Sequence, residues 1–377
     1  MTAHWRDIVN AEVVGEREKV CTLPGGETVE RQGRSLIVSF PDRGRAVLSS
    51  AKFNGGFFTA PSAVINTTSM GGEAETSLMS AGLNEHIAYY RECAKKVGLD
   101  PDTVVGLGTA VTMDKAAIVT KTVGRTSVSA VVTAGVEGNG GRAGDPASYD
   151  QSERFQEKNG TIVIILLIKA DLPAHSMARA IITATEAKTC ALQQLMAPSV
   201  YSTGIATGSG TDQIAVVCDS KSKIKLTDAG KHSLLGELIG KCVTEAVLKA
   251  LDNWAGLNPV SQRDAMKRLA RYKVGDSEYL NCVENEVSDK DGFITSLKRI
   301  STDGKIVAAV SSAIHIQDEI GWGILTEEDG KRFAEYSLSH VLLDNGIHDH
   351  HLEKNGDIIS NATLMLSYLA LKNHRNE

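Results

Sequence analysis

One apolar stretch constrains the fold of this 377-residue chain more than any other feature. It runs from Ile162 to Ile168 and contains no polar residue. A helix that crosses a bilayer needs about 20 apolar residues, so this stretch is far too short to be a transmembrane segment. Short apolar runs are typical of buried β-strands. We therefore predict a buried strand here, in a protein that folds around a β-sheet.

Further strands are predicted on both sides of this one. Residues 35–40 and 45–49 are two apolar runs separated by the turn Pro41-Asp-Arg-Gly, a pattern typical of a β-hairpin. Three more β-rich runs lie at 104–113, 116–121 and 128–133. Their short connections indicate antiparallel neighbours. A last strand is expected at 213–218.

Apolar residues at three- or four-residue spacing predict helices near 83–97, from about 174 to 192, and from about 233 to 254. Ser233 is the expected N-cap of the third helix. Helices that cluster beside a largely antiparallel or mixed sheet define an α+β fold. We assign that fold to residues 1–256, as a single domain.

The pattern breaks at Gly256-Leu-Asn-Pro, and the length of the chain favours two domains. The remaining sequence is richer in charge, with a strand expected at 305–312 and helices near 327–343 and 360–372. We predict that residues 257–377 form a smaller, α/β-containing accessory domain of unknown function.

Charge and composition exclude several classes of partner. A formal net charge of −6 provides no basic excess, so neither nucleic acid nor an anionic membrane is an expected partner. The N-terminus lacks the apolar segment of a signal peptide. The six cysteines are scattered, with no metal-type spacing. These features predict reduced thiols and a cytoplasmic protein, and they leave a homo-oligomer open.

The usual catalytic motifs do not occur in the sequence. There is no GxSxG, HExxH, GxxxxGK[ST] or complete GxGxxG, which removes the common starting points for serine hydrolases, zincins, NTPases and Rossmann enzymes. Residues 348–351, His-Asp-His-His, are the densest group of potential metal ligands. Adjacent ligands rarely converge on one ion, so we expect a solvated loop there and no metal site.

Several phrases occur in an order and spacing that resemble one enzyme family. They are LSSAKFNGG (48–56), VGLGTA (105–110), VTAGVEGNGGRAGD (132–145), GTI (160–162), ATEAKT (184–189), ATGSGTD (206–212) and GKHSLLG (230–236). Together they resemble the adenosylcobinamide amidohydrolase family over about residues 20–255. The resemblance implies hydrolysis of the amide between the corrin ring of adenosylcobinamide and its aminopropanol arm, giving adenosylcobyric acid for cobalamin salvage. It also implies that the corrinoid is a substrate, with no cofactor.

Amide hydrolysis needs a nucleophile, donors for the tetrahedral oxyanion and a proton for the leaving amine. Ser49 and Ser50 are candidate nucleophiles at a strand end, with Asn54 and the backbone of Gly55 and Gly56 as oxyanion donors. An ordinary serine- and glycine-rich turn is the alternative, and composition alone favours it.

Three titratable residues in the matched phrases are further catalytic candidates. Glu186 could act as general base or bind an amide of the corrin rim, although a glutamate on a helix surface needs no such role. His232, at the start of a helix, could act as a base. Asp212 could orient a histidine as the third member of a relay.

The same phrases supply the candidate substrate-binding residues. Besides Asn54, Gly55 and Gly56, these are Thr133, Asn139, Thr185, Thr207, Gly208, Ser209, Gly210 and Thr211. Glycines let backbone N–H groups approach a ligand closely. A tight connection that needs glycine for its backbone angles accounts for residues 207–212 equally well.

Two other functions remain open. A corrinoid-binding carrier could use the same glycine loops without hydrolysis. An amidase that exposes its nucleophile by cleaving its own chain could act on another substrate. Turnover distinguishes the first from an enzyme, and the intact mass distinguishes the second.

Overall fold

The computed structural model describes residues 5–69, 82–147, 150, 160–348, 352–353 and 356–375. The chain divides into two compact units, Met1–Asn258 and Pro259–Glu377. Each unit has its own hydrophobic core and is described separately.

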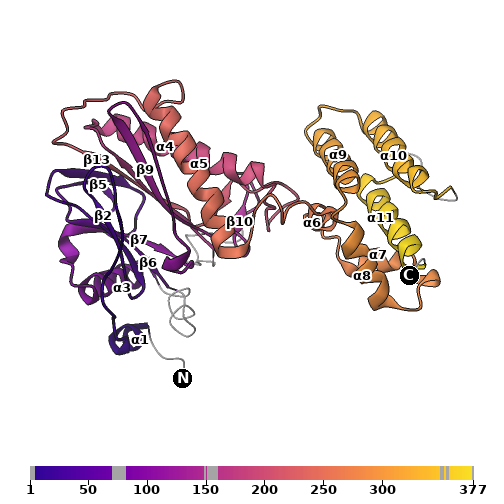
Figure 1. Cartoon of the computed structure of the whole chain (residues 1–377), viewed down its shortest axis with the longest axis horizontal. Coiled ribbons are helices and arrows are strands. Elements are labelled where there is room, and N and C mark those ends of the chain that lie inside the picture. The colour runs from indigo at the N-terminus through magenta and orange to yellow at the C-terminus, as the bar shows by residue number, and fades with distance from the viewer. Residues whose placement is uncertain are drawn as a thin grey trace. The chain divides into compact units, whose positions relative to one another are not determined.

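Unit 1 contains two large β-sheets (Figure 1). The first sheet has the order β1-β2-β3-β6-β7, from Glu18–Thr22, Thr28–Gln32, Ser35–Ser39, Ala63–Thr68 and Val104–Thr109. The second has the order β5-β4-β13-β11-β9-β8, from Gly56–Thr59, Arg45–Ser49, Gln213–Asp219, Ile162–Ile168, Thr126–Ala134 and Ala117–Val123. Two pairs are parallel, β6 with β7 and β11 with β13, and the other neighbours are antiparallel.

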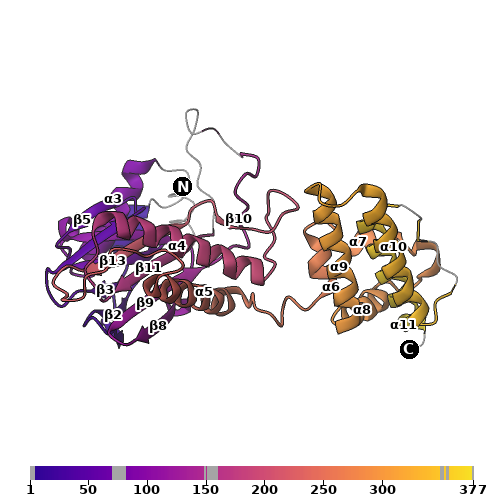
Figure 2. The same cartoon turned by 90° about the horizontal axis from the view of Figure 1, so that it is seen from above.

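The two sheets pack face to face, and helices cover the outer face of each. One apolar cluster joins Val64, Val105 and Leu107 of the first sheet to Val131 and Val217 of the second. Helices α4 (Ala174–Gln194) and α5 (Leu234–Ala255) pack side by side on the second sheet (Figure 2). Helices α1 (Trp5–Ala11) and α3 (Leu83–Lys96) pack on the first. The result is a four-layer arrangement of helix, sheet, sheet and helix, which confirms the predicted α+β fold with mixed sheets.

Strand β11 shows why its sequence is apolar throughout. Successive side chains of a strand point to opposite faces. Val163, Ile165 and Leu167 therefore lie between the sheets, whereas the alternate residues contact the layer formed by α4 and α5. The buried strand predicted at this position is confirmed.

The pairing of several other predicted strands is different. Residues 35–39 and 45–49 do form strands, but β3 belongs to the first sheet and β4 to the second, so the predicted hairpin is wrong. The true hairpin is β2 with β3, whose turn contains Gly33 at a φ of 54°. Strand β7 pairs in parallel with β6 rather than with β8, while the antiparallel pair β8–β9 is confirmed.

The long helices of unit 1 follow the sequence closely. Ser233 caps α5 by accepting a hydrogen bond of 3.0 Å from the backbone N–H of Gly236. Gly256 ends the same helix in the left-handed conformation, at a φ of 63°. Both ends are therefore fixed by residues that have the conformational preferences of helix caps. Short 3-10 helices at Pro101–Thr103 and Met113–Lys115 flank β7.

Unit 2 is helical in every element that the structure describes. The helices are α6 (Ala265–Ala270), α7 (Asp276–Asn281), α8 (Lys290–Ile300), α9 (Gly304–Gly321), α10 (Glu327–Asp344) and α11 (Ile358–Arg375), with a 3-10 turn at Glu284–Glu286. The helices predicted near 327–343 and 360–372 are confirmed. The strand predicted at 305–312 is wrong, because these residues belong to α9, and the expected α/β character of this unit is wrong with it.

Across the described ranges, no helix is long and apolar enough to cross a membrane.

Candidate active site

A cavity of about 640 Å³ opens at one end of the second sheet, beside α4. Its wall is formed by the loop around residues 139–147, one face of α4 and the segment 207–211. We call it the loop cavity. A short ladder, β10 (Gly140–Gly141) with β12 (Gly208–Ser209), holds two of these segments together. A backbone hydrogen bond of 2.8 Å from Thr207 N to Gly141 O extends the contact.

A largely buried ion pair lies beside the loop cavity, and its lysine lines the cavity. The ammonium group of Lys188, on α4, contacts Oδ2 of Asp212, and their side chains are only 8% and 13% exposed. Asp212 also accepts hydrogen bonds from the backbone N–H groups of Ile162 and Ser209, both at 3.0 Å. The hydroxyl of Ser209 donates to Oδ1 of Asp212 at 2.6 Å. The carboxylate thus joins α4, the start of β11 and the glycine-rich loop.

The absence of a side chain at Gly208 leaves room for this ion pair. A Cβ atom at this position would lie 2.3 Å from Oδ2 of Asp212 and 2.4 Å from Nζ of Lys188. The ion pair therefore crosses the space that any other side chain would fill. This contact gives one glycine of the predicted loop a specific structural reason.

Neutral polar groups form a second part of the cavity wall. Asn139 accepts a hydrogen bond of 2.8 Å from the hydroxyl of Tyr201 and donates to the carbonyl of Gly160 at 3.2 Å. Thr211 donates to the same carbonyl at 2.6 Å and lies 2.7 Å from the hydroxyl of Thr161. Such groups can both donate to and accept from an amide ligand.

Asp145 lies on the cavity rim as a carboxylate. Burial opposes its ionisation, but hydrogen bonds from Ser199, Ser202 and the backbone of Arg142 outweigh this effect and lower its pKa. The bond from Ser199 Oγ is 2.5 Å long. Asp145 thus holds the loop in place through several donors.

Seven of the predicted binding residues line the loop cavity. They are Asn139, Thr185, Thr207, Gly208, Ser209, Gly210 and Thr211. Thr133 does not line it; this side chain is buried between the sheets and accepts a hydrogen bond of 2.9 Å from Asn66. Three of the sequence phrases, 132–145, 184–189 and 206–212, therefore converge in space, although their order along the chain alone does not require it.

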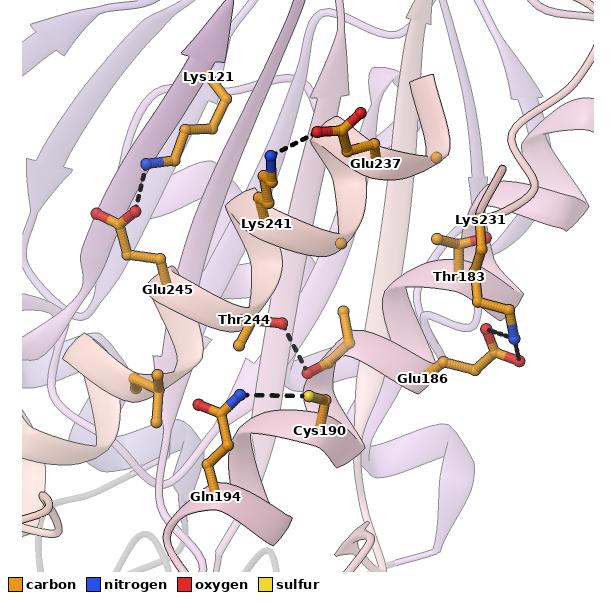
Figure 3. Close-up of a pocket in the computed structure, with 14 residues that line it drawn as sticks. Lys121, Thr183, Glu186, Cys190, Gln194, Lys231, Glu237, Lys241, Thr244 and Glu245 are labelled. Atoms are coloured by element: carbon orange, nitrogen blue, oxygen red, sulfur yellow. Dashed lines mark hydrogen bonds and ion pairs between the residues drawn. The ribbon is translucent and has the colours of Figure 1, made fainter. Parts of the chain in front are cut away.

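Glu186 and His232 lie elsewhere on the surface. Glu186 lines a different depression, of about 650 Å³, between α4 and α5, which we call the helix groove (Figure 3). There it forms an ion pair of 2.9 Å with Lys231. His232 is exposed and lines neither the loop cavity nor the helix groove. Asp212 binds Lys188 and Ser209, so the relay that was expected with a histidine is a contact with a lysine.

The segment 49–56 has structural contacts of its own. Ser49 is buried, and the hydroxyl of Ser50 accepts a hydrogen bond of 3.1 Å from the backbone N–H of Ile214. The side-chain amide of Asn54 donates to the carbonyls of Pro101 and Val104 at 2.8 and 2.7 Å, which ties this turn to the first sheet.

The two glycines that follow meet backbone requirements. A Cβ atom on Gly55 would lie 1.9 Å from the carbonyl oxygen of Ala51, and Gly56 has a φ of 80°. Other residues rarely adopt this φ. These contacts account for both glycines without a ligand.

The histidine-rich sequence at 348–351 is described only in part. His348 is described, and 349–351 lie outside the described residues. No group of three or more potential metal ligands gathers among the residues that the structure describes.

Sequence patterns did not point to Lys188, Tyr201 and Arg142, all of which line the loop cavity. Lys188 stands inside the phrase ATEAKT, close to Glu186. A period of 3.6 residues places Thr185, Lys188 and Thr189 on one face of α4 and Glu186 on another, which is a signal that the sequence did contain.

Comparison with known proteins adds the deciding observation. A family described as adenosylcobinamide amidohydrolase matches residues 21–259 of the chain. The chain belongs to this family. All residues that line the loop cavity and the helix groove lie within the part of the chain that matches the adenosylcobinamide amidohydrolase family.

Two individual proteins are similar to part of the chain, and one of them carries the family's name. A protein of Methanosarcina mazei named adenosylcobinamide amidohydrolase is 32% identical over 167 residues, which cover 43% of this chain and 71% of that protein. An uncharacterized protein of Methanocaldococcus jannaschii is 36% identical over 176 residues, which cover 43% of this chain and 68% of that protein.

A crystal structure of a Pyrococcus horikoshii protein covers 71% of this chain and 94% of its own, at 14% identity and a TM-score of 0.30. That similarity is too low to support any statement about fold or function.

Proposed function

We propose that this protein hydrolyses the amide that joins the corrin ring of adenosylcobinamide to its aminopropanol arm, for use in cobalamin salvage. The observation that carries the proposal is the convergence of seven residues from family-like phrases on one cavity, in a chain whose family match spans 21–259. The corrinoid is then the substrate and no cofactor is required.

The chemistry of the loop cavity supports an amide-bearing ligand. Its wall offers the hydroxyls of Tyr201, Ser209 and Thr211 and the amide of Asn139, which can pair with the amide groups of a corrin rim. Amide hydrolysis also needs stabilisation of the charge that develops in the transition state. The ion pair of Lys188 and Asp212 places a positive and a negative charge beside the cavity, and Lys188 lines it.

Incubation with adenosylcobinamide, without ATP or added metal, tests the proposal directly. The expected result is release of aminopropanol and a corrinoid acid, which chromatography and mass spectrometry detect. Tight binding without product over a long incubation would instead identify a carrier. A measured mass below 40.2 kDa for the purified chain would favour an amidase that cleaves itself.

A further inference from the structure

The described geometry singles out one hydroxyl of the loop cavity. On the basis of the hydrolysis proposed above, we infer that Ser209 is the nucleophile, that Asp212 accepts its proton, and that Lys188 acts as a positioning residue that holds Asp212. This assigns to Ser209 a covalent role instead of a binding role.

The acceptor of each hydroxyl proton distinguishes Ser209 from its neighbours. Thr185 and Thr189, on α4, donate to the carbonyl oxygens of Ile181 and Thr207, both at 2.9 Å. A backbone carbonyl is too weak a base to remove a hydroxyl proton. Ser209 Oγ instead donates to a carboxylate at 2.6 Å, a distance within the range for general-base catalysis.

A second serine and carboxylate pair does not have the same access. Ser199 Oγ donates to Oδ2 of Asp145 at 2.5 Å, but Ser199 is buried and does not line the cavity. Ser209 lines the cavity and is followed by Gly210, which is exposed and carries no side chain to block a ligand. A substrate carbonyl can therefore approach Ser209.

Lys188 acts on the reaction through Asp212. The ammonium group contacts Oδ2 and gives the carboxylate a counter-charge inside the fold, and removing one partner of such a pair leaves the other charge uncompensated. The N–H bonds from Ile162 and Ser209 fix its orientation, with Oδ1 toward the Ser209 hydroxyl. Because Gly208 leaves the space open, the lysine reaches Asp212 without displacing the loop.

The reaction balances with these groups alone. Ser209 Oγ bonds to the carbonyl carbon of the substrate amide as its proton passes to Asp212. Collapse of the tetrahedral intermediate breaks the C–N bond, and Asp212 returns the proton to the departing nitrogen of aminopropanol. Water then attacks the ester on Ser209, its proton passing to Asp212. Cleavage of the ester C–O bond returns that proton to Oγ and releases the corrinoid acid.

Steady-state kinetics and an acid-quench experiment test the assignment of Ser209. We expect Ser209→Ala to lower kcat by more than about a thousandfold while it still binds adenosylcobinamide, as removal of a nucleophile does in hydrolases. Ser220→Ala is the matched control at the opposite end of β13, where the serine hydroxyl donates to the carbonyl of Gly44, and it should keep wild-type kcat. Acid quench of the wild type, digestion and mass spectrometry should find the corrin acyl group on the peptide that contains Ser209.

The outcomes separate this inference from the function on which it rests. If the wild type shows no turnover, the proposed hydrolysis fails. If the wild type is active and Ser209→Ala keeps kcat within a few fold, only the assignment of Ser209 is overturned. An acyl group on a different peptide would overturn it as well.

Two substitutions test the positioning role of Lys188. Lys188→Met removes the charge at similar length, and we expect it to lower kcat by about a hundredfold or more with little change in KM. Lys188→Arg keeps the charge and should recover a large part of the lost kcat. Equal activity of the two variants, both folded by circular dichroism, would contradict a role that depends on charge.

Discussion

Gly208 lines the loop cavity, and its lack of a side chain leaves room for an ion pair. The carboxylate of Asp212 and the ammonium of Lys188 occupy the space where its Cβ would lie. The position is therefore sensitive for a reason of contact and not of backbone conformation, since Gly208 is absent from the residues with positive φ.

Gly208→Ala should separate the two charges. The carboxylate is fixed by backbone donors, so the substitution is expected to displace Lys188, to cost about 1–3 kcal/mol of stability and to lower kcat. Thermal unfolding and steady-state kinetics measure the two effects. Gly240→Ala is the control, because an added Cβ there meets nothing within 4 Å, and it should be neutral or stabilising by up to about 1 kcal/mol. A fully active and stable Gly208→Ala would show that the space is not needed.

The cysteines are expected to differ in reactivity because they differ in burial. Burial raises the pKa of the Cys242 thiol to about 12, whereas Cys190 is exposed on the helix groove. Near neutral pH this thiol therefore stays protonated, whereas the thiolate is the reactive form. Iodoacetamide on the native protein should modify Cys190 first and leave Cys242 intact, as measured by peptide mass spectrometry. Equal labelling of both in folded protein would contradict the burial of Cys242.

At the scale of elements, α4 presents two different surfaces. One face carries Thr185 and Lys188 into the loop cavity, and the adjacent face carries Glu186 into the helix groove. Residues next to each other in the sequence therefore serve separate depressions. Substitutions on the two faces of α4 can therefore show which depression holds the reaction.

Glu186→Gln tests which depression holds the reaction. Its ion pair with Lys231 is largely exposed, with side chains 46% and 64% accessible, and such pairs contribute about 0–1 kcal/mol. The substitution should leave stability unchanged and kcat within about threefold of wild type, and His232→Ala should behave in the same way. A hundredfold loss of kcat in folded Glu186→Gln would move the chemistry to the helix groove, and the same loss in folded His232→Ala would place it outside both depressions.

Sequence patterns located most elements but not their partners. The apolar runs at 35–39 and 45–49 identify β3 and β4 correctly, yet nothing local shows that the chain changes sheet between them. A strand is predicted at 305–312, but the segment packs as part of helix α9 against its neighbours. Tertiary packing overrides propensity in such cases.

The candidate site was predictable to a similar extent. The glycine-rich phrase around 208–210 identified the loop, because glycines at this density indicate a turn in which the backbone comes close to neighbouring groups. The contact between Lys188 and Asp212 joins residues 24 positions apart on different elements, so only the fold reveals it. Sequence patterns therefore predicted the loop but not the ion pair between Lys188 and Asp212 that joins it to α4.

At the scale of the whole molecule, the two units have separate cores. The clusters of unit 1 contain only residues up to Leu257, and the cluster of unit 2 begins at Ala265. The family match ends at residue 259, which is close to the limit between the units. We therefore propose that residues after this limit form an accessory domain.

Truncation after Asn258 tests whether unit 1 acts alone. Each apolar cluster of unit 1 is complete without unit 2, so the fragment should fold cooperatively. The loop cavity is also lined only by residues of unit 1, which is why we expect hydrolysis to persist with kcat within about tenfold of the full chain. Circular dichroism, thermal unfolding and turnover of adenosylcobinamide measure these outcomes, with the full chain as control. A fragment that folds but has no turnover would show that residues 259–377 contribute to the reaction, and the accessory role would have to be abandoned.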